Sequence, residues 1–365
     1  MTVRVRYAPS PTGSLHVGNA LTAAANRRFA DERGGTLVLR IDDTDAARGV
    51  EGGEDGILRD LAWLGIGFDE GPLRQSERAP VYAAAAARLV AVGAAAEEPD
   101  GSLRVAAKIA GASSAHRPTL LRPDGTATYH LASVADDVDL RITHIIRGVD
   151  HRSNADLHLA LTAALGAPVP EILHHGLILG SGGGAPPDLG TPPDPLVSIA
   201  DFREAGIPAA ALRVYLDELG LPQHDVRLDL KRLRRLAVEA IAAMSDEELA
   251  GQAGAPARLA VALRGARDLV EARDYAESLL TPPPPAIPAP PADALPTLLR
   301  FAELRVGAPA ELDDETARSI VRELQAVHAD LKALRRALTG RERGPELWAV
   351  VRALTREEAL ARAGV

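Results

Sequence analysis

The hydrophobic positions at the start of the chain follow two different periods. Short apolar runs at Val3–Tyr7 and Thr36–Ile41 have the length of strands. The Ala-rich stretch Leu21–Gly34 and the later stretch Glu54–Ile66 carry their apolar residues at helical spacing. A strand, a loop, a helix and a second strand make a βαβ unit, so the pattern predicts a parallel sheet and an α/β fold.

The pattern continues with a helix over Ala79–Val92 and a polar stretch, expected to be irregular, up to about Gly125. Two further segments, Ala127–Asp137 and Arg141–His151, are expected to be strands that lead into a site. Asn154–Gly166 again has helical spacing. The first part of the chain therefore alternates strands and helices, as α/β proteins do.

The remainder of the chain is helical by pattern. Glycine and proline dominate Gly180–Pro195, which excludes regular structure there and indicates a mobile loop. From Ile199 onward nearly every segment has helical spacing. The proline-rich stretch Thr281–Pro291 is typical of a polyproline spacer and divides this helical part in two.

Composition narrows the class of protein. The 365 residues suffice for two or three domains, and the absence of cysteine excludes disulfides, zinc–thiolate sites and thiol nucleophiles. No signal peptide or membrane-spanning stretch is visible, so a cytoplasmic enzyme with no membrane partner is expected. A net charge of −9 does not favour general nucleic-acid binding, although it permits a local basic patch.

Two polar segments follow predicted strands and are the candidate site. The sequence APSPTGSLHVGN, Ala8–Asn19, is too broken for a helix and too polar for a core. The sequence DDTD, Asp42–Asp45, follows the second strand. Ligands of parallel α/β sheets bind beyond the carboxyl ends of the strands. A glycine-containing turn that leads into a helix also offers N–H groups to an anion, so we expect a small ligand here.

Six blocks in order closely resemble one enzyme family. They are VRVRYAPSPTGSLHVGNA, GGTLVLRIDDTDAAR, DLAWLGIGFDEGPLRQSER, TYHLASVADD, ITHIIRGVDH and ADFREAGIPAAALRVYLDELG. Together they are similar to glutamyl-tRNA synthetase, a class I aminoacyl-tRNA synthetase, strongly over 1–95 and 125–220 and more weakly beyond. The resemblance implies a Rossmann-like catalytic domain with a parallel sheet, followed by an all-α C-terminal part.

The resemblance also implies a division of the chain. Residues 1–220 would be the catalytic domain, in which 94–127 is a shortened acceptor-binding insertion. Residues 221–280 would be a helical region similar to the family's stem-contact part. A proline-rich linker would cover 281–296, and 297–365 would be a remnant of the anticodon-binding domain.

The first block carries the expected ATP site. His16, Val17, Gly18 and Asn19 stand where the family has its HIGH signature. The resemblance assigns catalysis to His16 and Asn19, and ATP binding to Thr12, His16, Gly18 and Asn19. It implies ATP with Mg²⁺ as the cofactor and, for want of cysteine, no zinc. In isolation, the same residues could form an ordinary helix-capping loop with a surface histidine.

The amino-acid pocket follows from the same comparison. Arg6 and Arg147 match family arginines that bind the substrate's side-chain carboxylate, and Arg can bind a carboxylate bidentately. Asp42 stands where the family usually has Glu, against the α-amino group. The remaining pocket residues are Ala8, Ser10 and Tyr129. The alternative is that the two arginines form structural ion pairs, with Asp43, Asp45 or Asp150 as partners.

Three departures separate the chain from the family. The second signature, a lysine-bearing KMSKS loop, should fall within Ser181–Pro195, which contains no lysine or arginine. A missing preorganised donor costs about 10²–10³ in rate. The insertion at Ala94–Ala127 is short, and the helical C-terminal part is compressed. These losses describe a divergent, truncated paralogue with weakened tRNA binding.

Two functions are compatible with these residues. The first is ATP-dependent activation of glutamate, or a close analogue, as an acyl-adenylate, with transfer to tRNA or to another acceptor such as a protein or small molecule. The second is a catalytically impaired paralogue that binds glutamate or its adenylate and acts as a regulatory partner. The lysine-free loop distinguishes them more than any other feature.

Overall fold

The structure is a computed structural model that describes residues 2–45, 49–110, 117–180, 198–282 and 294–364. The predicted loop at 180–195, apart from its first residue, and most of the proline-rich spacer lie outside these ranges. The chain divides into two compact units, Met1–Phe202 with Arg213–Leu230 and Arg203–Leu212 with Lys231–Val365. Each unit is described by itself.

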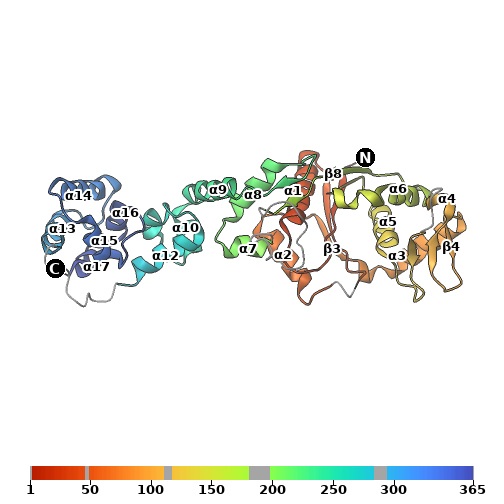
Figure 1. The fold of residues 1–365 in the computed structure, drawn as a ribbon, viewed down its shortest axis with the longest axis horizontal. Helices are drawn as coiled ribbons and strands as arrows, with labels where there is room; N and C mark the ends of the chain where they lie inside the picture. Colours follow the sequence, from red (N-terminus) through yellow and green to blue (C-terminus); the bar gives the residue numbers. More distant parts are fainter. Residues whose placement is uncertain (1, 46–48, 111–116, 181–197, 283–293, 365) are drawn as a thin grey trace. The chain divides into compact units, whose positions relative to one another are not determined.

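A parallel sheet forms the centre of the first unit (Figure 1). Strands β1 (Arg4–Tyr7), β2 (Thr36–Ile41) and β3 (Glu70–Arg74) pair in that order, and both pairs are parallel. Strands β7 (His144–Gly148) and β8 (Glu171–His175) form a second parallel pair. The Thr143 N–H donates to the Arg4 carbonyl at 2.9 Å, which places β7 beside β1. The α/β prediction is confirmed.

The predicted helices of this unit are present, with small differences at their ends. They are α1 (Val17–Glu32), α2 (Gly53–Trp63), α3 (Ala79–Ala91) and α6 (Ala155–Ala164). Helix α1 begins at Val17 because His16 is extended and its Nδ1 accepts the Gly18 N–H. The chain turns away from α1 at Gly34, whose φ of 57° is in the left-handed region.

One predicted strand is wrong. The segment Ala127–Asp137 instead belongs mostly to helix α5 (Tyr129–Asp139). Its apolar residues Leu131, Val134 and Ala135 follow helical spacing and are buried. Both faces of the segment are buried in part, and this obscured the period in the sequence.

The stretch expected to be irregular up to Gly125 is also not so. It contains an antiparallel sheet of β4 (Ala95–Glu97), β5 (Leu103–Val105) and β6 (Thr119–Leu121), and the short helix α4 (Ala107–Ala110). These strands of three residues are too short to show an alternating pattern. Leu103, Val105 and Leu120 bury their side chains with those of α3 and α5 in one apolar cluster. Tertiary packing therefore provides what the local sequence does not.

The end of the first unit and the whole second unit are nearly all helical, as predicted. The exception is a parallel pair, β9 (Ile178–Leu179) with β10 (Val226–Arg227), in the first unit. The helices are α7 (Ile199–Glu204), α8 (Ala209–Leu219), α9 (Leu230–Ala243), α10 (Asp246–Ala253), α11 (Ala260–Leu263), α12 (Leu269–Leu280), α13 (Leu295–Gly307), α14 (Asp314–Ala326), α15 (Leu331–Thr339), α16 (Leu347–Ala353) and α17 (Arg356–Ala363).

A single apolar cluster crosses the proline-rich spacer. Leu259 and Leu279, before the spacer, share it with Phe301, Leu334 and Val350 after it. The two helical regions that the sequence separates therefore share a core in the second unit. None of the helices described in this chain has the length and apolar character to cross a bilayer.

A buried carboxylate attaches α2 to the loop between β1 and α1. Asp60 is 1% exposed and accepts the Ser14 hydroxyl at 2.7 Å and the Leu15 N–H at 2.8 Å. Gly53 lets the start of α2 approach the same loop, because a Cβ there would lie 2.3 Å from the Pro11 carbonyl oxygen. The path of this loop therefore depends on α2.

Replacing Asp60 should destabilise the protein. Asp60→Ala leaves the buried Leu15 N–H without its acceptor, so the free energy of unfolding should fall by about 1–3 kcal/mol. The control is Arg59→Ala, an exposed site on the same helix, with an expected change within about 0.5 kcal/mol. Urea denaturation followed by circular dichroism measures both. Equal changes in the two variants would contradict this role.

Two histidines join α5 to α6. His130 Nδ1 lies 3.1 Å from His158 Nε2, and His158 is 4% exposed. Burial, with the nearby His130 as a smaller cause, lowers the pKa of His158 to about 3. In the unfolded chain, His158 has its ordinary, higher pKa and takes up a proton more readily than in the folded protein. Burial of the neutral ring therefore stabilises the folded protein fully only above the pKa of the unfolded state. This contribution is lost as the pH falls below about 6.5.

The stability of the protein should therefore fall on mild acidification. Between pH 7.5 and pH 5, proton uptake by unfolded His158 should lower the free energy of unfolding by about 2 kcal/mol. His158→Gln cannot take up this proton, so its loss over the same interval should be smaller. Urea denaturation at both pH values measures the difference. If His158→Gln keeps the full pH dependence while the exposed control His224→Gln matches wild type, His158 is not the group responsible.

Candidate functional site

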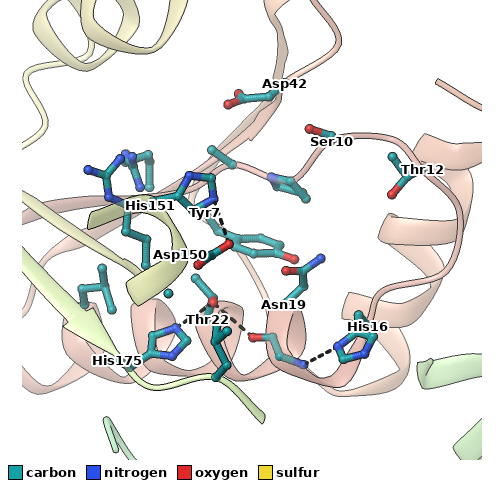
Figure 2. A pocket seen from close by; sticks show the side chains of 18 of the residues that line it. Tyr7, Ser10, Thr12, His16, Asn19, Thr22, Asp42, Asp150, His151 and His175 are labelled. Carbon is teal, nitrogen blue, oxygen red and sulfur yellow. Dashed lines mark hydrogen bonds and ion pairs between the residues drawn. The ribbon is translucent and has the colours of Figure 1, made fainter. Parts of the chain in front are cut away.

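The carboxyl ends of β1, β2, β7 and β8 open into one cavity of about 610 Å³ (Figure 2). This volume is in the range of small-ligand pockets. All ten residues predicted to bind ATP or the amino acid line it: Arg6, Ala8, Ser10, Thr12, His16, Gly18, Asn19, Asp42, Tyr129 and Arg147. The residues predicted to bind ATP and those predicted to bind the amino acid therefore line the same cavity.

Arg147, at the end of β7, is a buried cation with unused donors. It is 5% exposed, and its Nε and Nη2 atoms have no hydrogen-bond partner in the part of the chain that the structure describes. Its Nη1 donates to the Tyr129 hydroxyl over a long 3.5 Å. Burial lowers the pKa of Arg147, but a guanidinium stays charged at neutral pH. An anion in the cavity would satisfy these donors.

Arg6, on β1, has a partner inside the protein. Its Nε donates to Asp137 at 3.1 Å, and both side chains are buried. Asp137 was not among the partners considered from the sequence. Of those, Asp43 accepts hydrogen bonds from Ser76, and Asp150 lies 3.6 Å from His151. Arg6 is therefore an ion-paired residue that also faces the cavity.

Asp42, at the end of β2, is held by Arg40. The two Asp42 oxygens accept from Arg40 Nε at 2.6 Å and Nη2 at 3.1 Å. Burial raises the pKa of Asp42, while the charge of Arg40 opposes that rise. A buried carboxylate that faces the cavity can bind an ammonium group of a ligand.

Tyr129 begins helix α5 and connects the two sides of this half of the cavity. Its hydroxyl lies 3.3 Å from His151 Nδ1 and near Arg147. Burial raises the pKa of Tyr129, so the phenol keeps its proton at neutral pH. The small residues Ala8 and Ser10, from the loop after β1, line the same space without filling it.

The other half of the cavity is built at the start of α1. Figure 2 shows Thr12 on the loop and His16, Asn19 and Thr22 at or on the helix. His16 Nδ1 accepts from the Gly18 N–H at 3.2 Å, so in the neutral ring Nε2 carries the proton and can donate. Partial burial lowers the pKa of His16, which favours that neutral form. The apolar residues Leu177, Ile178 and Leu179 also line the cavity.

This half has the chemistry that a nucleotide needs. It combines a histidine donor, an amide and the turn into a helix, and the apolar residues of the cavity wall could contact a base. Within the described ranges, no three histidine or acidic side chains are arranged to hold a metal ion. The stretch 181–195, where the family's second signature was expected, lies outside the described residues.

Several lining residues were missed by the sequence analysis. Tyr7 and Ser133 have buried hydroxyls with no hydrogen-bond partner in the described parts of the chain. Arg40 and His175 also line the cavity, and His175 Nε2 lies 2.9 Å from the Thr22 hydroxyl. A charged residue inside an apolar strand, such as Arg40 in TLVLRI, was the available signal.

The amino-acid sequence is similar to those of known proteins over nearly the whole chain. The family described as tRNA synthetases class I (E and Q), catalytic domain, matches residues 2–100 and 100–227. A protein named glutamate–tRNA ligase 1 from Rubrobacter xylanophilus is 36% identical over 433 residues, covering 99% of this chain and 97% of that protein. Glutamate–tRNA ligase 2 from Koribacter versatilis is 38% identical over 60% of this chain and 56% of its own length.

Solved structures show the same fold. The structure of a glutamate tRNA ligase from Elizabethkingia meningosepticum, in complex with its amino acid, superposes with a TM-score of 0.76 at 21% identity. It covers 100% of this chain and 99% of that one. The glutamate-tRNA synthetase of Elizabethkingia anophelis gives a TM-score of 0.70, also at 21% identity. With the family match and the full-length relative, these findings show that the chain belongs to the glutamyl-tRNA synthetases of class I.

Proposed function

We propose that the protein binds glutamate and ATP in this cavity and activates the amino acid as glutamyl-adenylate. An oxygen of the α-carboxylate attacks the α-phosphorus of ATP and forms a new P–O bond. The bond from that phosphorus to the bridging oxygen breaks, and pyrophosphate leaves with the electron pair. The family uses ATP, usually with Mg²⁺, and its relatives here are glutamate–tRNA ligases.

The observation that carries the proposal is Arg147. Among the described residues its guanidinium has no hydrogen-bonded acidic partner, and burying such a charge costs several kcal/mol of desolvation. A ligand carboxylate would supply the missing charge and two acceptor oxygens. Arg6 faces the same space, so a second cation supports binding of a side-chain carboxylate. In this arrangement Asp42 binds the α-amino group, and Tyr129 orients Arg147.

We assign ATP binding to the other half of the cavity. His16 donates from Nε2 to phosphate oxygens as negative charge develops, and Asn19 adds a second polar group. Gly18 lets the nucleotide approach the backbone. Thr12, on the loop between β1 and α1, lines the same part of the cavity.

We infer that the acceptor is tRNA, since the relatives are glutamate–tRNA ligases, and that it is bound more weakly than by a typical family member. The alignment with the Rubrobacter protein spans 433 residues, more than the 365 of this chain, so that protein has stretches without a counterpart here. The second candidate is a paralogue impaired in activation that retains glutamate binding and acts as a regulatory partner. The absence of lysine and arginine from 181–195 favours it.

Glutamate recognition should depend on Arg147. Arg147→Met keeps much of the side-chain volume but removes the charge, so glutamate affinity should fall at least about 30-fold, or about 2 kcal/mol. The exposed Arg152→Ala should stay within about threefold of wild type. Calorimetric titration with glutamate and glutamine measures both. Wild type that binds glutamine as tightly as glutamate, or Arg147→Met that binds glutamate normally, would refute a carboxylate-reading arginine.

Activation should be visible as glutamate-dependent ATP–pyrophosphate exchange, measured with and without tRNA. His16→Ala removes a donor to the developing charge, so the exchange rate should fall about 10²–10³-fold. The exposed His224→Ala serves as the control and should keep the wild-type rate. Glutamate binding without any exchange would contradict activation and support the impaired paralogue.

A further inference from the structure

One carboxylate oxygen joins the two arginines on the central strands. Asp137 Oδ1 accepts from Arg6 Nε at 3.1 Å and from Arg40 Nη1 at 2.9 Å. Asp137 is on helix α5, whereas Arg6 and Arg40 are on β1 and β2. All three side chains are at least nine-tenths buried. The contact is therefore little weakened by water.

Arg40 extends this contact to the other end of the amino-acid site. Its side chain is fully buried, and its Nε and Nη2 hold both oxygens of Asp42. A guanidinium is planar and rigid, so its bonds to Asp137 and Asp42 fix the positions of these two carboxylates relative to each other. An unbroken series of hydrogen bonds runs from Arg6 through Asp137 and Arg40 to Asp42.

We propose that Asp137 is a positioning residue that determines the length of the amino-acid side chain the site accepts. The inference rests on the proposed function, in which Arg6 and Asp42 bind opposite ends of the substrate. By occupying Arg6 Nε, Asp137 leaves the two Nη groups of Arg6 for the ligand. Because Asp137 also holds Arg40, it sets the distance between the carboxylate-binding and ammonium-binding groups.

The neighbouring Asp136 offers a matched comparison. It is fully buried, but its hydrogen bonds go away from the site, to Arg78 Nε at 2.7 Å, Gln75 Nε2 at 2.8 Å and the Tyr82 hydroxyl at 3.1 Å. It approaches this series at 3.6 Å from Arg40 Nε, an atom that already donates to Asp42. Loss of its charge should affect stability and leave the distance between Arg6 and Asp42 set.

The test compares Asp137→Asn with Asp136→Asn. Calorimetric titration of wild type and both variants with L-glutamate and L-aspartate gives the affinity ratio, and urea denaturation gives their stabilities. We expect wild type to prefer glutamate. Asp137→Asn should weaken glutamate binding at least tenfold, because the spacing of Arg6 and Asp42 is no longer held. Aspartate binding should stay within about threefold, because the variant adds one net positive charge near the ligand. Asp136→Asn should keep the wild-type ratio.

These measurements distinguish failure of the proposed glutamate binding from failure of the role proposed for Asp137. If wild type does not bind glutamate, the proposed function fails, and this inference fails with it. If wild type prefers glutamate but both variants keep that ratio, the proposed function stands and Asp137 has no role in selecting length. The same applies if Asp137→Asn weakens both amino acids equally, or if Asp136→Asn changes the ratio as much.

Discussion

The structure of the site depends on the pairing of buried charges at the carboxyl edge of the sheet. Arg40 is fully buried, and such a cation is tolerated only with acidic partners in good geometry. Asp42 and Asp137 accept its hydrogen bonds, and Asp136 lies farther away, at 3.6 Å. Since Asp137 belongs to α5, its hydrogen bonds to Arg6 and Arg40 hold this helix against β1 and β2.

The buried arginines of the site differ in whether the protein itself supplies a carboxylate partner. Arg6 and Arg40 have carboxylate partners inside the protein, whereas two donors of Arg147 have none among the described residues. The internal ion pairs fix the positions of Arg6, Arg40 and Asp42, which lowers the conformational cost of binding. This arrangement supports the proposed binding of a ligand that has a carboxylate for Arg147 and an ammonium group for Asp42.

The predicted site residues lie together because of where their motifs fall along the chain. Residues directly after a strand, such as Ala8 and Asp42, meet at one edge because parallel strands end there together. Tyr129 also reaches the cavity, although the strand predicted around it is the helix α5. The small antiparallel sheet at 95–121 was missed, because its short strands are stabilised by packing against α3 and α5 and have little local signal.

By itself, the sequence determined the α/β class, the helical remainder, the family and the ten residues that share the cavity, because hydrophobic period and motif order are local properties. Only the tertiary structure decided the ion pairs. Asp137 is 131 positions from Arg6 and 97 from Arg40, so no local pattern links them. Which buried arginine is ion-paired, and which keeps donors without a partner among the described residues, depends on packing between distant elements.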